Sequence, residues 1–335
     1  MWQQRQTSCI SRQMKDRHIV IVTFPGCQLL DVSGPASVFA TAAEVPGTSP
    51  YKITLVSSQG GEIASSCGIG ISTQSAESIA VSSIDLLLVA GGSEEGLRLL
   101  CTDQKMASWA RAVSQHAARF GSVCTGSFVI AAWGLADGKR IATHWASSRL
   151  LSQLFPSVTI DPDPIYVEDG KLWTSAGITT GIDMALAIVA RDHGEGVAAS
   201  VARHLVLPLR RHGNQAQHSL LLEAQAGIDG RYAELASWIV ENIGERIPVA
   251  EMAKRMGESE RSFQRRFRQA TGHSPAAFVG RLRLEHARDL VMSGRSVKEA
   301  ARACGFISAD HFSRAYTRAF GVPPSALKPR APVAD

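Results

Sequence analysis

The stretch VAEMAKRMGESERSFQRRFRQATGHSP, residues 249–275, returns 48 residues later as VKEAARACGFISADHFSRAYTRAFGVPP, residues 297–324. The two copies align with one inserted residue, and each has helical spacing on both sides of a short turn that contains glycine. A helix, a tight turn and a second helix form the helix-turn-helix unit, whose second helix enters the major groove of DNA. The repeat therefore predicts two such units, at about 247–272 and 296–321.

The second helix of each predicted unit has an aromatic stripe and a polar stripe. Phe263 and Phe267 lie four positions apart, as do Phe312 and Tyr316, and this spacing places each pair on one inner face. Arg binds guanine and Gln binds adenine through two hydrogen bonds each, so the polar stripes carry residues suited to reading bases. A solvated basic face would give the same pattern in one helix, but its repetition in tandem favours DNA binding. The outward residues are Arg261, Ser262, Gln264, Arg265 and Arg268 in the first unit and Asp310, His311, Ser313, Arg314 and Thr317 in the second.

The charge of the chain is unevenly distributed. Residues 231–335 carry 18 Lys and Arg against 11 Asp and Glu, whereas residues 1–230 carry 17 against 19. The net charge of +5 therefore comes from a basic C-terminal segment joined to a mildly acidic N-terminal one. A basic segment of this kind is typical of a module that binds a polyanion.

The N-terminal segment alternates short apolar runs with helical stretches. Nearly continuous apolar strands separated by helices indicate a doubly wound parallel sheet covered on both faces. The run RIATHW (140–145) predicts a further strand, a turn at Asp169–Gly170 predicts a hairpin, and 179–194 has the spacing of a long helix. The predicted parallel strands are 18–24, 51–58, 84–92 and 119–124, with helices near 35–44, 103–118 and 125–134.

These patterns divide the chain into four parts. We expect a loose tail over 1–17, an α/β domain over 18–212, a linker over 213–230 and an all-α DNA-binding domain over 231–330. No apolar run approaches the roughly 20 residues that span a bilayer, and the polar N-terminus does not resemble a signal peptide. The six cysteines are scattered without metal-ligand spacing, which predicts reduced thiols in a cytoplasmic protein with no metal and no cofactor.

Cys124 occupies a distinctive position in the α/β segment. A strand ends at Val123 and a helix follows from Gly126, so Cys124 lies at a sharp turn between them. The amides and dipole of a helix N-terminus stabilise a thiolate, which predicts a lowered pKa at this nucleophile elbow. A buried structural cysteine is the alternative. His144 follows the strand 140–143, at the edge where open α/β sheets bind ligands, and could either contact a ligand or serve a structural role.

The C-terminal motifs carry a family resemblance. GESERSFQRRFRQATGHSPAAFVGRLRLEHARDLV (257–291) with SVKEAARACGFISADHFSRAYTRAFGVPPSAL (296–327) resembles the AraC/XylS DNA-binding domain over its whole length. The resemblance implies that the long helix RLRLEHARDLV links the two units and sets their reading helices in successive major grooves. By position it makes Arg261, Gln264, Arg265, Asp310, Ser313 and Arg314 base-facing.

The α/β segment resembles the flavodoxin-like PfpI and class I glutamine amidotransferase-like fold, in the GlxA-type subgroup that is fused to AraC domains. LDVSGPASVF (30–39), LLLVAGG (86–92), VCTG (123–126), ATHW (142–145) and TSAGITTGIDMAL (174–186) carry this similarity. Asp31 occupies the position of the acid near the cysteine in this fold. PfpI-type peptidases have His after the cysteine, where this chain has Thr125, which disfavours peptidase chemistry. The isocyanide hydratase branch shares the Asp and the Cys-Thr-Gly.

Together these features predict a transcriptional regulator that binds promoter DNA and senses a small metabolite, and family analogy makes it an activator. We expect the ligand pocket around Asp31, Cys124, Thr125 and His144, and by resemblance a nitrogen metabolite as effector, RNA polymerase as a partner and a homodimer as the assembly. A Cys-dependent hydrolase or hydratase fused to a DNA-binding domain is the alternative, with Cys124 and Asp31 as its catalytic candidates. Oxidation of Cys124 in a redox sensor is a third reading.

Overall fold

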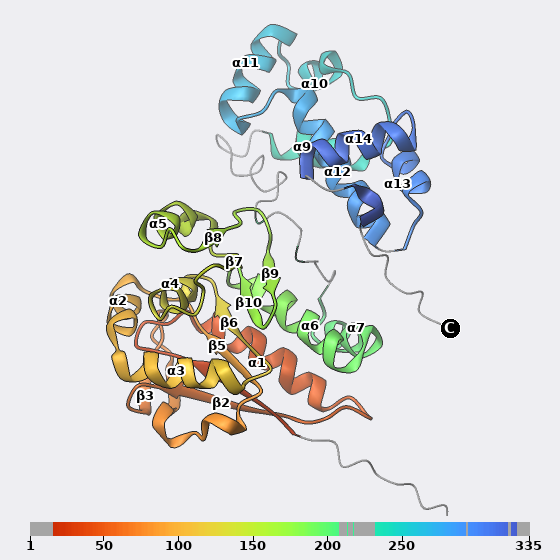
Figure 1. Cartoon of the computed structure of the whole chain (residues 1–335). Coiled ribbons are helices and arrows are strands. Elements are labelled where there is room, and N and C mark those ends of the chain that lie inside the picture. The colour runs from red at the N-terminus through yellow and green to blue at the C-terminus, as the bar shows by residue number, and fades with distance from the viewer. Residues whose placement is uncertain are drawn as a thin grey trace, which may run out of the picture. The chain divides into compact units, whose positions relative to one another are not determined.

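The computed structural model describes residues 16–207, 213, 217, 232–292, 294–320 and 323–326. The chain divides into two compact units, Met1–Gln217 and His218–Asp335, which are described separately below (Figure 1). The predicted tail and linker lie almost entirely outside the described residues, so the domain boundaries remain predictions. None of the helices in the described part of the chain has the length and apolar character needed to cross a membrane.

The first unit is built on an eight-stranded sheet with the order β3-β4-β2-β1-β5-β6-β10-β9. The central strand β1 pairs in parallel with β2 on one side and with β5 on the other, which confirms the predicted doubly wound sheet. Antiparallel hairpins close both edges, β3 with β4 and β9 with β10. The strands are β1 (Arg17–Val22), β2 (Tyr51–Ser57), β3 (Gly61–Ala64), β4 (Gly70–Ser75), β5 (Leu86–Val89), β6 (Arg119–Val123), β9 (Tyr166–Asp169) and β10 (Leu172–Ser175).

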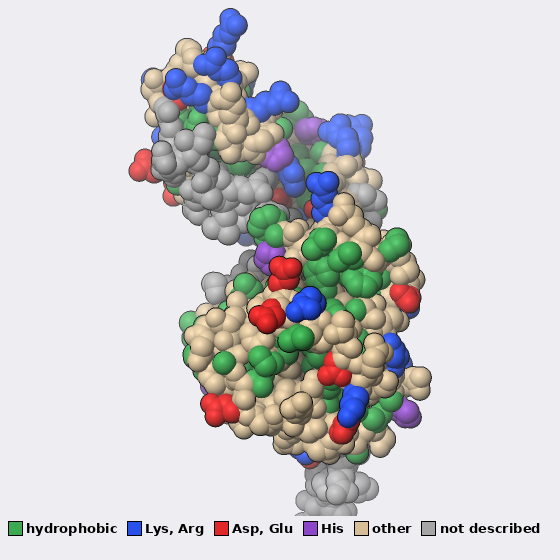
Figure 2. Space-filling model, turned by 90° about the vertical axis from the view of Figure 1, so that its left-hand side faces the viewer, with side chains coloured by type: hydrophobic (Ala, Val, Ile, Leu, Met, Phe, Trp, Pro, Cys, Tyr) green, Lys and Arg blue, Asp and Glu red, His purple; other side chains and the backbone are tan. Residues whose placement is uncertain are grey.

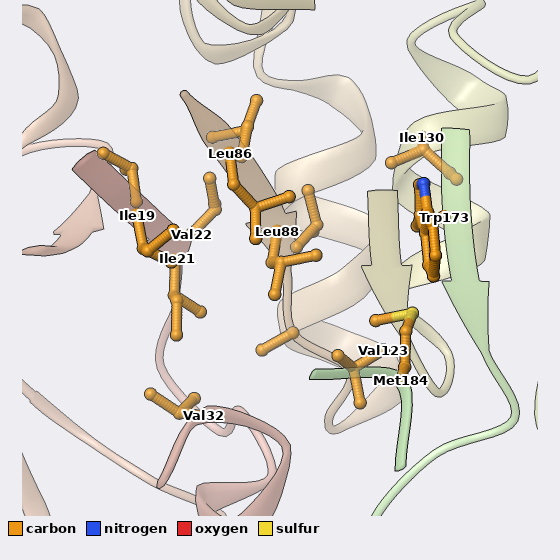
Figure 3. Packing of buried hydrophobic residues seen from close by; sticks show 14 of the residues in the cluster. Ile19, Ile21, Val22, Val32, Leu86, Leu88, Val123, Ile130, Trp173 and Met184 are labelled. Atoms are coloured by element: carbon orange, nitrogen blue, oxygen red, sulfur yellow. The ribbon is translucent and has the colours of Figure 1, made fainter. Parts of the chain in front are cut away.

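The central strands are apolar on both faces because helices cover both faces. Ile19 and Ile21 of β1 and Leu86 and Leu88 of β5 are almost completely buried and pack side by side (Figure 3). One layer consists of α1 (Leu29–Ala43), α6 (Thr179–His193) and α7 (Glu195–His204), which contact one another. The other layer consists of α2 (Glu94–Thr102), α3 (Gln104–His116) and α4 (Gly126–Ala132).

Several elements differ from the prediction. The helix expected near 35–44 begins earlier, at Leu29, because Pro35 is accommodated inside it. Of the strand expected over 140–145, only β7 (Arg140–Ile141) forms, and it pairs with β8 (Thr159–Ile160) in a separate small sheet. The hairpin β3–β4 and helix α5 (Ser148–Leu154) were not predicted, since their short, polar, partly exposed segments give a weak periodic signal. Helix α2 was not predicted either, although its buried Leu97 and Leu100 have helical spacing.

In the described residues of the second unit all regular elements are helices, as predicted. Ser259 caps α11 and Ser296 caps α13 through their side chains, and Gly272 ends α11 in a left-handed conformation, with φ +72°. Two hydrophobic clusters form its interior, one around Phe263 and Phe267 and one around Phe312 and Tyr316. The helices are α9 (Ala233–Glu241), α10 (Val249–Arg255), α11 (Glu260–Thr271), α12 (Pro275–Met292), α13 (Val297–Ala303) and α14 (Ala309–Phe320).

Candidate functional site

Cys124 lies at the sharp turn between β6 and α4, as the sequence indicates. Its φ is +57°, a left-handed conformation that is uncommon for a residue with a side chain. Gly126 makes the turn possible, because a Cβ there would lie 2.3 Å from the carbonyl oxygen of Val89. The turn therefore has the strained geometry of a nucleophile elbow.

Asp31 of α1 lies directly beside this turn. One carboxylate oxygen accepts the N–H of Gly91 at 3.1 Å, and the other accepts the N–H of Ile178 at 2.9 Å. The thiol of Cys124 also hydrogen-bonds to this carboxylate. Burial raises the pKa of Asp31 to about 6, even though all three hydrogen bonds favour the ionised form. Asp31 thus connects the loop after β5, the loop after β10 and the elbow.

The loop after β10 covers the thiol. A Cβ on Gly177 would lie 2.6 Å from the Sγ of Cys124, so only glycine allows the loop to approach this closely. Gly177 is fixed by the hydroxyl of Thr180, which accepts its N–H and donates to its carbonyl oxygen, both at 2.8 Å. As a result only 7% of Cys124 is exposed.

The expected lowered pKa of Cys124 is wrong. Burial, and after it the negative charge of Asp31, raise the pKa of the thiol to about 12. The N–H and hydroxyl of Thr125 lower the pKa, as a helix N-terminus should, but they are outweighed. At neutral pH the thiol is protonated and donates to Asp31, which does not favour its use as a nucleophile.

This protonation state predicts slow alkylation of Cys124. The matched comparison is Cys67, an exposed cysteine whose pKa is lowered by hydrogen bonds involving Ser65 and Ile69. Because the thiolate is the reacting species, iodoacetamide at pH 8 should modify Cys67 at least about 100-fold faster than Cys124 in the native protein. Peptide mass mapping against time measures both rates in one sample, and denaturation should abolish the difference. Equal native rates would show that the loop opens readily or that the thiol is ionised.

Thr125 and His144 have different positions relative to the elbow. The Thr125 hydroxyl accepts the N–H of Gly92 at 3.1 Å, so Thr125 lies with Asp31 at the end of β5. His144 is half-buried and begins the short helix Trp145–Ser147, where its Nδ1 accepts the N–H of Ala146 at 3.4 Å. The backbone joins His144 to the elbow, since the hydroxyl of the preceding Thr143 donates to the carbonyl oxygen of Cys124 at 3.4 Å. The structure thus brings Asp31, Cys124 and Thr125 together, and His144 is linked to them through Thr143.

A hollow of about 430 Å³ lies at the same edge of the sheet and was not predicted. It is lined by Phe24 after β1, Ser58 after β2, and Leu99 and Asp103 near the end of α2. Asp103 is already engaged, because it accepts the Ser58 hydroxyl at 2.7 Å and caps α3. For Phe24 and Ser58, the position at the end of a predicted strand was the available sequence signal. Among the described residues, no group of three or more His, Cys, Asp or Glu side chains could hold a metal ion.

The outer face of α11 forms the second candidate site. Arg261, Gln264, Arg265 and Arg268 are all exposed, whereas Phe263 and Phe267 are buried. The four residues line an open hollow of about 840 Å³, together with Glu260, Gln269 and Ser274, which were not predicted. Ser262 is half-buried, and its hydroxyl and N–H interact with the capping Ser259. Lys and Arg side chains gather on this helical unit (Figure 2).

The outer face of α14 is less basic. Asp310, His311, Arg314 and Thr317 are exposed and Ser313 is half-buried, whereas Phe312 and Tyr316 are buried. The Thr317 hydroxyl donates to the carbonyl oxygen of Ser313 at 2.8 Å, and the His311 ring packs edge-on against Phe306. Eight of the ten predicted outward residues are thus exposed, Ser262 and Ser313 are half-buried, and α11 has the higher density of Arg.

Comparison with known proteins accounts for both units. Residues 17–191 match the DJ-1/PfpI family, and residues 252–330 match a helix-turn-helix domain family. The HTH-type transcriptional regulator GlxA of Rhizobium meliloti is 28% identical over 319 residues, which cover 90% of this chain and 93% of that protein. An isonitrile hydratase of Pseudomonas putida is 35% identical over 188 residues, which cover 56% of this chain and 77% of the enzyme.

The fold of a THiJ/PfpI family protein from Pseudomonas syringae is similar, with a TM-score of 0.54 and 21% identity over 76% of this chain and 96% of that one. The DJ-1/PfpI match spans more than half of the chain and includes Asp31 and the Cys124 elbow. The second match covers both α11 and α14. The chain therefore belongs to the DJ-1/PfpI family, and it joins a domain of that family to an AraC-type helix-turn-helix domain.

Proposed function

We propose that this protein, a DNA-binding transcriptional regulator, reads promoter DNA with α11 and α14 and changes that binding when a small metabolite occupies its α/β unit. The outward Arg and Gln side chains on α11, held over a buried aromatic stripe, carry the proposal. Arg and Gln are the side chains best suited to bidentate bonds with guanine and adenine. The lower charge of α14 suggests that α11 contributes more of the affinity.

Arg265 provides the sharpest test of DNA reading. Arg265→Ala should weaken binding to the specific operator by about 1–3 kcal/mol, or roughly 5- to 150-fold, because a bidentate base contact is lost. Fluorescence anisotropy with an operator selected from random duplexes measures the loss, and footprinting locates it. Lys105→Ala, which removes one positive charge from the α/β unit, is the control and should bind as wild type does. An unchanged footprint and affinity for Arg265→Ala would exclude Arg265 from base reading.

For sensing, we propose an effector site over the elbow, formed by Asp31, Cys124, Thr125 and His144. The burial and protonation of Cys124 argue against covalent chemistry, because a nucleophile must be reachable and ionised. An effector that contacts Cys124 would have to displace the loop at Gly177, and such a displacement is how binding would change the conformation of the unit. The same burial argues against a redox sensor. Binding would act on DNA affinity by shifting the population of DNA-competent arrangements.

A hydratase is the second candidate function. Two observations favour it: the hydrogen bond between Asp31 and Cys124, and the similarity to isonitrile hydratase. A thermal-shift screen of small nitrogen metabolites on wild type and Cys124→Ser, with product analysis, separates the two functions. A compound that raises the melting temperature of both proteins and is recovered unchanged supports a sensor. A compound that wild type consumes and the variant only binds supports an enzyme.

The remaining proposals follow from binding promoter DNA. We propose a homodimer that contacts paired half-sites, action as an activator through RNA polymerase, and location in the cytoplasm, where bacterial DNA lies. Analytical ultracentrifugation and in vitro transcription test the assembly and the sign of regulation.

A further inference from the structure

The end of α9 is held by a side chain from the middle of α12. The Nε of Arg283 donates to the carbonyl oxygen of Ile243 at 3.0 Å, and its Nη2 donates to the carbonyl oxygen of Glu245. These carbonyls follow the last turn of α9, where backbone acceptors lack helical partners. Arg283 is half-buried, and burial lowers the pKa of its guanidinium. Arg283 therefore stabilises the backbone after α9 and does not extend into solvent.

The same segment also touches the end of α13. A Cβ on Gly244 would lie 2.8 Å from the carbonyl oxygen of Ala303, the last residue of α13. Gly305, with φ +69°, is equally constrained: a Cβ there would lie 2.8 Å from the Gly244 carbonyl oxygen and 3.1 Å from the Arg283 guanidinium carbon. Two backbones and one guanidinium thus meet where side chains would not fit. We call Gly244, Arg283 and Gly305 the junction.

The junction connects the two hydrophobic clusters of the helical unit. α9 belongs to the first cluster through Leu235 and Ile239, which share it with Phe263 of α11. α13 belongs to the second cluster through Ala300 and Ala301. The long helix α12 contributes to both clusters, so the junction is a second attachment between them. If α12 were the only connection, the two clusters and their helices could bend and twist relative to each other. The second attachment restricts these motions.

We propose that the junction of Gly244, Arg283 and Gly305 fixes the orientation of α11 relative to α14. It thereby sets the spacing that one chain accepts between its two half-sites, the base pairs read by α11 and those read by α14. This proposal rests on the proposed reading of DNA by both helices. B-DNA turns once in about 10 to 10.5 base pairs, so each inserted base pair rotates one half-site by about 35° relative to the other. A rigid pair of reading helices cannot follow that rotation, whereas a loosened pair can. Arg283 and the two glycines are thus positioning residues for spacing selectivity.

The test uses the full chain and an operator selected by the wild-type protein from random duplex DNA. Footprints of Arg265→Ala and Arg314→Ala assign the half-site of each helix, and one or two base pairs are then inserted between the half-sites. Wild type should lose at least tenfold in affinity on the first insertion. Arg283→Ala and Gly244→Ala should bind the original operator more weakly than wild type does. Inserting one base pair should then lower their affinity by less than threefold. Arg283→Lys, which can keep one of the two bonds, should restore part of the selectivity.

Gly280→Ala is the matched control, because it changes glycine to alanine on α12 where a Cβ would meet nothing within 4 Å. It should behave as wild type does. The proposal would be overturned if junction variants fold normally by circular dichroism and still lose tenfold in affinity when a base pair is inserted. If Arg283→Ala does not fold, Gly244→Ala and Arg283→Lys decide the question. A wild type that selects no operator refutes DNA reading itself, whereas one that binds DNA without preference for spacing refutes only the junction.

Discussion

Replacement of Phe267 by Ala should destabilise the first helix-turn-helix unit by about 3–5 kcal/mol and abolish specific DNA binding at moderate temperature. Phe267 is 1% exposed, and its ring centroid lies 5.1 Å from that of Tyr232 and 5.3 Å from those of Phe263 and Phe278. Removing a buried ring loses both its transfer free energy and its packing, and the remaining aromatic cluster can collapse only partly. A loss of this size approaches the whole stability of a small domain.

Urea unfolding followed by circular dichroism measures the effect, and anisotropy with the selected operator measures the binding. The matched control is Gln264→Ala on the same helix, three residues away and exposed. It should change the free energy of unfolding by less than about 0.5 kcal/mol while weakening operator binding. The two variants separate loss of the scaffold from loss of a base contact. If the free energy of unfolding of Phe267→Ala were within 1 kcal/mol of the wild-type value, the buried aromatic residues would not be what stabilises α11.

The helical unit was predictable from sequence because its signals agree with one another. Phe263 and Phe267 are spaced for a helix, Ser259 caps α11 and Gly272 ends it, and the same arrangement occurs again around Phe312. In the α/β unit, the buried strands β1, β2, β5 and β6 were likewise predictable, since parallel strands covered on both faces are continuously apolar. The edge hairpin β3–β4 was not, because GEIA and GISTQS are short and half exposed and contain few β-branched or aromatic residues.

The site was predictable in its composition but not in its electrostatics. Sequence placed Cys124 at a strand-to-helix turn with Asp31 near it, and both positions are correct. The protonation state depends on a third segment, the loop at Gly177 and Ile178, which lies more than fifty residues further along the chain. That loop buries the thiol, and burial outweighs the helix amides that sequence alone reveals. A local motif can identify an elbow, whereas its reactivity depends on what the fold places over it.

Asp31 should make the stability of the α/β unit fall as the pH rises from about 4 to about 6. Burial raises the folded-state pKa of Asp31 from 3.8 to about 6, so in this interval the folded state binds more protons than the unfolded state. Stability then decreases with increasing pH, because deprotonation favours the state with the lower pKa. A shift of about two pH units corresponds to about 3 kcal/mol across the interval. Above pH 6 the carboxylate is ionised, and its three hydrogen bonds offset only part of the cost of burying the charge.

Asp31→Asn isolates this contribution, since the amide has the shape of the protonated acid and does not titrate. The free energy of unfolding of the variant, minus that of wild type, should rise by about 3 kcal/mol between pH 4 and pH 7 in urea titrations. Asp169→Asn serves as the control, because the N–H of Arg140 lowers the pKa of half-buried Asp169 below its usual value. Its difference should fall as the pH rises through the interval below about 4 and stay nearly flat between pH 4 and pH 7. If the difference in free energy of unfolding between Asp31→Asn and wild type does not change with pH, the carboxyl of Asp31 keeps an ordinary pKa. The loop over Cys124 would then admit water, and the thiol would be as accessible as an enzyme requires.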